Sequence, residues 1–213
     1  MDKIKTILVR SEFEKKYMVE GFGFPAEKCK IVRLSCGITP LDTLPQKEPF
    51  CLHISLLCDK RKNVKRLIDA AKKYNFRLVL AGKLRNQEEQ QLLNSWIGNT
   101  DNIEYRGFIS EKEKMDLYSR AKVFALPSTN EGVGIVALEA AAMGCDIVIT
   151  KLGGPHEYYN DKAKIVNPYN VDEIGQAVKY FIDGNSFQPE LGKYILQNYN
   201  NENISKILYN SIK

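Results

Sequence analysis

The chain has 213 residues, of which 44% are hydrophobic and 27% charged, and its formal net charge is +5. This is the composition of a globular protein with one good core, and no apolar run approaches the roughly 18 to 20 residues that a membrane-spanning helix needs. The charge is mild and is not interleaved with aromatic residues, so we expect no nucleic-acid partner.

The first forty residues predict strands over residues 4–9 and 30–34, with a helix over residues 12–21 between them. Two strands and one helix cannot bury a core alone. We therefore expect residues 1–40 to be the remnant of a domain that is mostly missing here. The proline-bearing stretch Thr39–Pro49 has the composition of an interdomain linker. Residues 41–213 then form a second domain.

From about residue 50 onward, short β-branched runs alternate with amphipathic stretches of helical period. The expected strands span residues 50–57, 76–81, 103–106, 122–126, 146–150 and 164–166. The expected helices span residues 63–74, 86–97, 111–120, 133–143 and 171–182, with a helical tail from about residue 188. Near-continuous apolar strands are typical of a parallel sheet covered on both faces. We therefore predict an α/β fold with a doubly wound, Rossmann-like parallel sheet, which binds ligands at the carboxyl ends of its strands.

Residues 60–66 concentrate much of the positive charge in the run Lys-Arg-Lys-Asn-Val-Lys-Arg. Three interpretations stay open: a solvated helix start, a nucleic-acid patch and a phosphate-binding corner.

The stretch from Leu126 to Gly144 is the most informative part of the sequence. A strand ends at Pro127, polar turn residues follow, and two glycines open a helix that stops at Gly144. Glycines let a ligand approach the backbone, and the amides of a first helical turn favour a phosphate group. Glu131 and Glu139 are separated by roughly 12 Å of helical rise. They could therefore accept hydrogen bonds from hydroxyls on two parts of one elongated ligand, with a diphosphate between them.

Glu131 and Glu139 resemble the E-x7-E motif of retaining glycosyltransferases with the GT-B fold, in the glycosyl transferases group 1 (GT4-like) family. Residues 103–109 resemble that family's strand and G-F/Y-V loop, residues 117–123 its L-Y-x-x-A-D-V segment, and residues 147–157 its P-V-V-x-T-x-x-G-G-x-x-E continuation. The resemblance covers nearly the whole chain. It identifies the chain as the C-terminal, donor-binding half of a GT-B fold with the end of the N-terminal acceptor domain.

The resemblance implies a role for each matching residue. Glu139 would hold the nucleotide ribose, Glu131 would contact the donor sugar in the catalytic centre, and Lys62 would neutralise the diphosphate leaving group. The other donor-binding residues are Gly132, Val133, Gly134 and Ile135 at the sugar and diphosphate, Gly107, Phe108 and Ile109 at the base, Gly82 and Lys83 at another edge of the cleft, and Arg61. The family carries Gly-Arg where this chain has Ser55–Cys58, and Arg61 could replace that arginine.

The implied reaction is metal-independent, retaining hexosyl transfer from a nucleoside-diphosphate sugar, as in polysaccharide biosynthesis, with no cofactor. The chain has no Asp-x-Asp pair, which agrees with metal independence. The sequence does not choose among uridine, guanosine and adenosine, and we expect a UDP-sugar. The missing acceptor domain is an expected partner. The positive balance suits peripheral contact with an anionic inner membrane surface.

Two alternatives remain open. A non-catalytic nucleotide-sugar binding module would share the donor site, and we expect the isolated chain to bind nucleotide weakly without turnover. A nicotinamide-dependent oxidoreductase domain is the other, because Gly132–Ala137 with Glu157 about twenty residues on satisfies a loose dinucleotide fingerprint. That fingerprint normally follows the first strand, whereas here three or more strand–helix units come first.

The cysteines and histidines predict no metal site. The five cysteines include no Cys-x-x-Cys pair, and His53 and His156 are scattered, so we expect buried free thiols. The start Met1–Lys5 lacks the apolar stretch of a secretory leader, and we expect a cytoplasmic protein.

Overall fold

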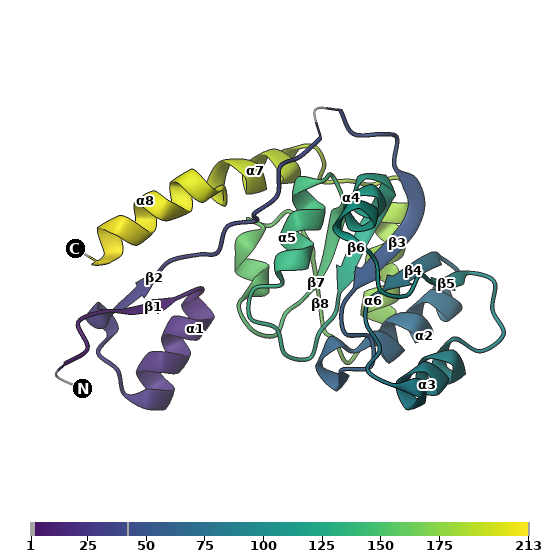
Figure 1. Ribbon diagram of the computed structural model, residues 1–213, viewed down its shortest axis with the longest axis horizontal. Helices are drawn as coiled ribbons and strands as arrows, with labels where there is room; N and C mark the ends of the chain where they lie inside the picture. Colours follow the sequence, from purple (N-terminus) through teal and green to yellow (C-terminus); the bar gives the residue numbers. More distant parts are fainter. Residues whose placement is uncertain (1–2, 42, 213) are drawn as a thin grey trace.

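The chain folds into two separate parallel sheets, joined by a long irregular segment. The computed structural model describes residues 3–41 and 43–212. The predictions for the chain start and for the two domains also cover residues 1, 2, 42 and 213, which lie outside the described residues. The smaller sheet pairs β1 with β2, and the larger has the strand order β5-β4-β3-β6-β7-β8. Figure 1 shows the small sheet and its helix α1 beside the large sheet rather than within it.

The large sheet is parallel throughout. Its strands are β3 (Glu48–Ile54), β4 (Arg77–Ala81), β5 (Ile103–Tyr105), β6 (Ala121–Leu126), β7 (Asp146–Thr150) and β8 (Lys164–Val166). All six expected strands are present, although β3 ends at Ile54 rather than Leu57. Leu57 lies outside any strand but is fully buried in one of the two hydrophobic cores, so its apolar side chain reflects burial and not strand structure. The strand order reverses between β3 and β6, and such a reversal opens the crevice where doubly wound sheets bind ligands.

Helices cover both faces of the large sheet, which confirms the doubly wound fold. One face carries α2 (Val64–Tyr74), α3 (Gln87–Ile97) and α6 (Val171–Ile182), and the other carries α4 (Glu111–Arg120), α5 (Ile135–Ala142) and α7 (Glu190–Asn198). Leu52 and Phe124 pack into the α4–α5 core, while their neighbours Cys51 and Val123 pack into the α2–α6 core. Each fully buried Leu or Phe contributes about 1.5–3 kcal/mol, so this alternation stabilises both layers.

The helix starts follow from local capping. Ser110 and Glu113 form a reciprocal capping box at the start of α4, and the Asn170 side chain accepts from two amides at the start of α6. Such caps satisfy backbone donors that have no partner inside the helix, and each is worth about 0.5–2 kcal/mol.

The N-terminal unit consists of β1 (Ile7–Val9), α1 (Glu12–Lys16), a π-helical turn (Tyr17–Gly21) and β2 (Cys29–Ile31). The expected strand, helix and strand are therefore present. The expected helix over residues 12–21 changes type at Tyr17, where the backbone widens into the π-helical turn.

Glu157 ties the N-terminal unit to the large sheet. This residue lies in a 3-10 turn after β7, and its carboxylate accepts from the amides of Glu12 at 2.8 Å and Phe13 at 2.9 Å. Arg33 donates to the same carboxylate at 3.3 Å. A carboxylate at a helix N-terminus meets unpaired amides and the positive end of the helix dipole, so the contact fixes α1 against the sheet.

The next residues extend this contact. The Tyr158 hydroxyl donates to the Arg10 carbonyl at 2.8 Å and accepts from the Leu34 amide at 3.3 Å. A Cβ atom at Gly154 would lie 2.3 Å from the Ser11 hydroxyl oxygen, so the approach of the two units requires glycine there.

The described residues between β2 and β3 (32–41 and 43–47) form no helix or strand, but several of them are firmly held. The last two residues of the expected linker, Glu48 and Pro49, belong to β3. The Lys47 ammonium donates to the carbonyls of Tyr118 at 2.9 Å and Met143 at 2.6 Å, at the C-terminal end of α5. Burial lowers the pKa of Lys47. The Cys36 amide donates to the Tyr199 carbonyl at 2.9 Å. Helix α8 (Asn201–Ile212) continues from α7 toward the end of the molecule where β1 and β2 lie (Figure 1).

All five cysteines are free thiols, as expected, and only Cys58 is not buried. No helix in residues 3–41 and 43–212 is long and apolar enough to cross a membrane.

Candidate functional site

Lys62 and Glu131 meet where the strand order of the large sheet reverses. Lys62 follows β3 and Glu131 follows β6, and the Lys62 ammonium lies 2.7 Å from the Glu131 carboxylate. The two loops are also joined through their backbones: the Thr129 amide donates to the Arg61 carbonyl at 2.8 Å, and the Asn63 side chain donates to the Pro127 carbonyl at 2.9 Å. The sequence prediction that these residues share one site is consistent with this geometry.

Glu131 is held from several directions. Its carboxylate accepts from the Ser128 hydroxyl at 3.2 Å and from the Gly132 amide at 3.2 Å, and only 12% of its side chain is exposed. A Cβ atom at Gly153 would lie 2.1 Å from the Glu131 carbonyl oxygen. The Gly153–Gly154 turn is therefore a packing requirement of this site.

The helix α5 begins beside Glu131, at Ile135 rather than at the expected Val133. Gly134 adopts a left-handed φ of 71° and cannot be part of the helix. No acceptor among the described residues bonds to the amides of Val133, Gly134 or Ile135. Unpaired amides at a helix start, together with the helix dipole, favour an anionic group such as a phosphate. The Val133 side chain is 4% exposed, so Val133 can offer a ligand only its backbone.

Glu139 lies inside α5 and is bound by two α4 residues that were not predicted. The Tyr118 hydroxyl donates to its carboxylate at 3.1 Å, and the Lys114 ammonium lies 3.1 Å from the same oxygen. Lys114 also pairs with Glu111 at 2.7 Å. Burial lowers the pKa of Lys114, but its hydrogen bonds to Glu111 and Glu139 outweigh burial and raise the pKa. Residues four apart share one helix face, and that spacing of Lys114 and Tyr118 could have indicated a common partner.

A cavity of about 700 Å³ lies at the carboxyl ends of β4 and β5. Lys83, Tyr105 and Phe108 line it together with residues at the start of α3. The Gly82 amide donates to the Gly107 carbonyl at 2.8 Å, which joins the two strand ends. Phe108 is 79% exposed, which is unusual for a large apolar side chain and leaves its ring available for stacking on a planar ligand.

Two predicted residues lie apart from this arrangement. The Ile109 side chain lines a different hollow, with Leu117 and Arg120 of α4. Only the backbone of Ile109 could therefore contact a ligand in the 700 Å³ cavity. The Arg61 guanidinium makes two hydrogen bonds to Asp59, at 3.1 and 2.7 Å. These bonds hold the pKa of Asp59 at about 2.

His53 lies buried on β3, next to the point where the strand order reverses. Its Nδ1 lies 2.7 Å from the Ala125 carbonyl oxygen, and its Nε2 lies 2.7 Å from the Ser55 hydroxyl. A carbonyl can only accept, so Nδ1 carries the proton and Nε2 accepts from Ser55. Burial lowers the pKa of His53 to about 4, and the ring is neutral at pH 7. His53 thus joins β3 to β6 beneath the site.

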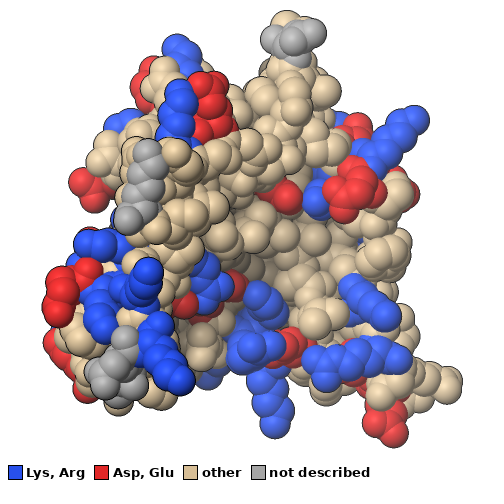
Figure 2. All heavy atoms as spheres, turned by 60° about the vertical axis from the view of Figure 1, so that its left-hand side comes forward, with Lys and Arg blue, Asp and Glu red and all other residues tan. Residues whose placement is uncertain are grey.

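Charge is unevenly spread on the face that Figure 2 shows. Lysine and arginine side chains gather in its lower half, with acidic side chains among them. No group of three or more His, Cys, Asp or Glu side chains in the described part of the chain could hold a metal ion.

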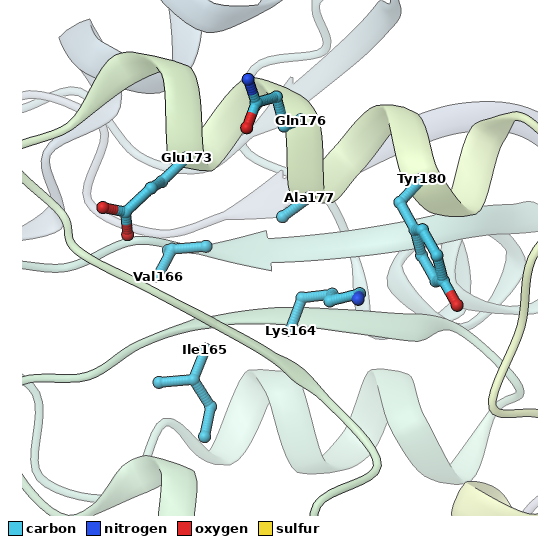
Figure 3. Close-up of a pocket in the computed structure, with 7 residues that line it drawn as sticks. All are labelled: Lys164, Ile165, Val166, Glu173, Gln176, Ala177 and Tyr180. Carbon is cyan, nitrogen blue, oxygen red and sulfur yellow. The ribbon is translucent and has the colours of Figure 1, made fainter.

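A separate hollow of about 300 Å³ lies over β8 and α6 (Figure 3) and contains none of the predicted site residues. Its two charged side chains, Lys164 and Glu173, already have partners. The Lys164 ammonium lies 3.8 Å from the centre of the Tyr180 ring, and the Glu173 carboxylate accepts from the Asn167 amide at 2.8 Å.

Glu157 does not fit the dinucleotide interpretation. The glycine-rich loop follows β6, the fourth strand of the large sheet along the chain, and the Glu157 carboxylate already binds two α1 amides and Arg33. It is therefore not available to a ribose hydroxyl.

Asp146, the first residue of β7, has a structural role. Its buried carboxylate binds Lys122 at 3.0 Å, the Ser186 hydroxyl at 2.7 Å and the Phe187 amide at 2.7 Å. It thereby anchors the connection that leads into α7.

Several known proteins are similar to this chain in sequence. The family model described as Glycosyl transferases group 1 matches residues 42–198. The O-antigen chain mannosyltransferase B of Escherichia coli is 26% identical over 88% of this chain and 54% of its own length. An uncharacterized glycosyltransferase of Methanocaldococcus jannaschii is 29% identical over 97% of this chain and 59% of its own length. The chain thus spans a little more than half the length of these curated relatives.

Solved structures show the fold. Sucrose-phosphate synthase from Thermosynechococcus elongatus superimposes with a TM-score of 0.80 at 20% identity, over 97% of this chain and 58% of that one. Anabaena HepE in complex with UDP superimposes with a TM-score of 0.78 at 17% identity, over 98% of this chain and 63% of that one. Such neighbours are GT-B glycosyltransferases, and this chain matches a little more than half of each of the two.

Proposed function

We propose, from the fact that this chain belongs to the glycosyl transferases group 1 family, that its cleft binds the nucleoside-diphosphate sugar donor of a hexosyl transfer. The observation that carries the proposal is the alignment of three features along one loop and helix. Glu131 stands at one end, the unpaired amides at the start of α5 follow, and Glu139 lies further along the same helix. A donor with its sugar at Glu131, its diphosphate at the amides and its ribose at Glu139 would use all three.

The chemistry of the reaction fits these groups. Breaking a glycosyl–phosphate bond develops negative charge on the departing diphosphate, and cations and backbone amides stabilise that charge. The Lys62 ammonium lies beside Glu131, between the loop that follows β3 and the loop that follows β6. Its charge is balanced by the Glu131 carboxylate at 2.7 Å, and a bound diphosphate would share the ammonium with that carboxylate. We propose that Lys62 and the α5 amides perform this stabilisation without a metal ion.

The base would lie in the 700 Å³ cavity, against the exposed Phe108 ring and beside Lys83. Arg61 would add positive charge near the diphosphate once Asp59 releases it. We propose a UDP-sugar, because Anabaena HepE was solved with UDP. Mannose is the first sugar to test, because the similar E. coli protein is an O-antigen chain mannosyltransferase. Retention of configuration and the preceding acceptor domain remain predictions, as does peripheral contact with an anionic membrane.

A non-catalytic binding module is the second candidate. It would use the same donor site, formed by Glu131, the amides at the start of α5 and Glu139. Both candidates predict nucleotide binding, and only the first predicts sugar transfer when the acceptor domain is supplied.

The test is calorimetric titration with uridine, guanosine and adenosine diphosphates, comparing the chain with its Glu139→Gln variant. Losing hydrogen bonds from ribose to a carboxylate costs about 1.5–3 kcal/mol, which weakens binding about 10- to 150-fold. Lys114 keeps Glu111 as a partner in the variant, so the fold should survive.

Glu202→Gln on the exposed α8 surface is the matched control and should bind like the parent chain. Equal nucleotide affinity of the parent and Glu139→Gln would contradict the assignment of Glu139. Binding of a nicotinamide dinucleotide with no nucleoside diphosphate binding would contradict the proposed function.

A further inference from the structure

We propose that Tyr118 and Lys114 of α4 are positioning residues that hold one oxygen of the Glu139 carboxylate, so that its other oxygen selects nucleotides with both ribose hydroxyls. The inference rests on the proposed function, because it concerns the carboxylate assigned to the ribose. It adds that α4, to which the sequence assigns no site residue, determines the preference for ribonucleotides over deoxyribonucleotides.

Both donors converge on a single oxygen of Glu139. The Tyr118 hydroxyl donates to Oε2 at 3.1 Å, and the Lys114 ammonium lies 3.1 Å from the same atom. A carboxylate oxygen has about two lone-pair sites, so these two donors use Oε2 fully. No donor within residues 3–41 and 43–212 bonds to Oε1, so both of its sites are left for a ligand.

Tyr118 is a rigid donor. Its side chain is fully buried, and its ring packs edge-on against Phe124 at 5.8 Å. Its backbone carbonyl accepts from the Lys47 ammonium at 2.9 Å. Burial raises the pKa of Tyr118 above its usual value. The hydroxyl therefore keeps its proton at neutral pH and donates it to the carboxylate.

Lys114 is confined beside the same oxygen. Only 16% of its side chain is exposed, and its ammonium also pairs with Glu111 at 2.7 Å. This second ion pair limits the movement of the ammonium. Because residues four apart share one face of a helix, α4 presents the Lys114 ammonium and the Tyr118 hydroxyl to α5 side by side.

Anchoring Oε2 fixes the direction in which Oε1 can accept. An unanchored glutamate samples several rotamers, and a ligand that bonds to it has to restrict them. Two neighbouring ribose hydroxyls would donate to the two lone pairs of a fixed Oε1. A site built to bond hydroxyls rejects analogues that lack them, because its polar group is then left unpaired. Without the two anchors, the ribose hydroxyls would gain less from Glu139, while the base and the diphosphate would bind as before.

The test is calorimetric titration with uridine diphosphate and with its 2′,3′-dideoxy analogue, which lacks both hydroxyls. Tyr118→Phe removes only the hydroxyl, and Lys114→Met removes the ammonium but keeps an unbranched side chain. We expect each variant to weaken binding of uridine diphosphate about tenfold, which equals about 1.4 kcal/mol. The analogue does not use Glu139, so its weaker affinity should be the same in both variants as in the parent chain. Binding of the analogue also shows that each variant is folded.

Tyr74→Phe and Lys73→Met are the matched controls. The Tyr74 hydroxyl and the Lys73 ammonium also share one carboxylate oxygen, that of Asp172, at 2.7 and 2.6 Å. Neither residue lines the 700 Å³ cavity. Both control variants should bind the two nucleotides like the parent chain.

A parent chain that binds uridine diphosphate and the analogue equally would overturn the inference, as would equal losses for both nucleotides in Tyr118→Phe and Lys114→Met. Unchanged or tighter binding of uridine diphosphate in these two variants would also overturn it. A parent chain that binds no nucleoside diphosphate would overturn the proposed function, and the inference that rests on it would fall as well.

Discussion

Replacing Glu157 with glutamine should loosen the N-terminal unit from the sheet without unfolding the sheet. The carboxylate accepts from the amides of Glu12 and Phe13 at 2.8 and 2.9 Å and from Arg33 at 3.3 Å. Glutamine keeps one acceptor oxygen, so one charge-assisted bond is lost and the others become weaker. Hydrogen bonds to charged groups are worth about 1.5–3 kcal/mol and neutral ones about 0.5–1.5 kcal/mol, so we expect a loss of about 2–4 kcal/mol.

The assay is native-state hydrogen exchange, because it separates local from global opening. In Glu157→Gln, amides of β1, α1 and β2 should exchange about 30- to 800-fold faster, the ratio that corresponds to about 2–4 kcal/mol. Amides in the centre of β3 and β6 should exchange as in the parent chain. Glu104→Gln is the control, because Glu104 makes only exposed ion pairs with Arg77 and Arg106, which are worth about 0–1 kcal/mol.

The reasoning fails if exchange in β3 and β6 accelerates as much as exchange in α1, since the unit and the sheet would then open together. It also fails if α1 exchange is the same in Glu157→Gln and Glu104→Gln.

Two further predictions concern the sheet beneath the site. Since burial lowers the pKa of His53 from 6.5 to about 4, its neutral form stabilises the fold fully above pH 6.5, and about 3 kcal/mol should be lost as the pH falls from 6.5 to 4. Urea unfolding at several pH values should show a flatter pH dependence in His53→Gln, and an unchanged slope would contradict the assigned neutral ring. At Gly82, a Cβ atom would lie 1.8 Å from the Ser55 carbonyl oxygen, so Gly82→Ala should cost about 3 kcal/mol or more. Gly184→Ala, which also has a positive φ but open space, should cost only about 1–2 kcal/mol by the same measurement, and equal losses would refute the steric explanation.

The sequence predicted the centre of the sheet because β3, β4, β6 and β7 are mostly apolar runs that are buried on both faces. β7 and β8 and the helices α4 and α6 begin and end at the expected residues. The proximity of the Lys62 and Glu131 loops could also be predicted. Both loops follow strands of one parallel sheet, and both residues match positions of the family that the sequence resembles. The start of α5 was wrong by two positions because the left-handed Gly134 excludes Val133 from the helix.

Contacts between distant segments could not be predicted. Nothing in the pattern around Glu157 indicates that it caps α1, because the two are far apart in the sequence and meet only after folding. The spacing of Lys114 and Tyr118 places both on one face of α4, but it does not say which residue of another helix that face contacts, so Glu139 was not identified as their partner. Arg10 was assigned no role because its proximity to Gly132 depends on the docking of the N-terminal unit.

The bracing of the Glu131 loop has a thermodynamic consequence. Thr129 is bonded to the Arg61 backbone, Pro127 to the Asn63 side chain, and the Glu131 carbonyl is enclosed by Gly153. The conformational entropy of this loop was therefore lost when the chain folded, and a ligand that binds there does not have to order it again. Preorganisation of this kind improves affinity by lowering the entropic cost of association. The heat-capacity change on ligand binding at the Glu131 loop should then reflect only the surface that binding buries, with no contribution from ordering of the loop.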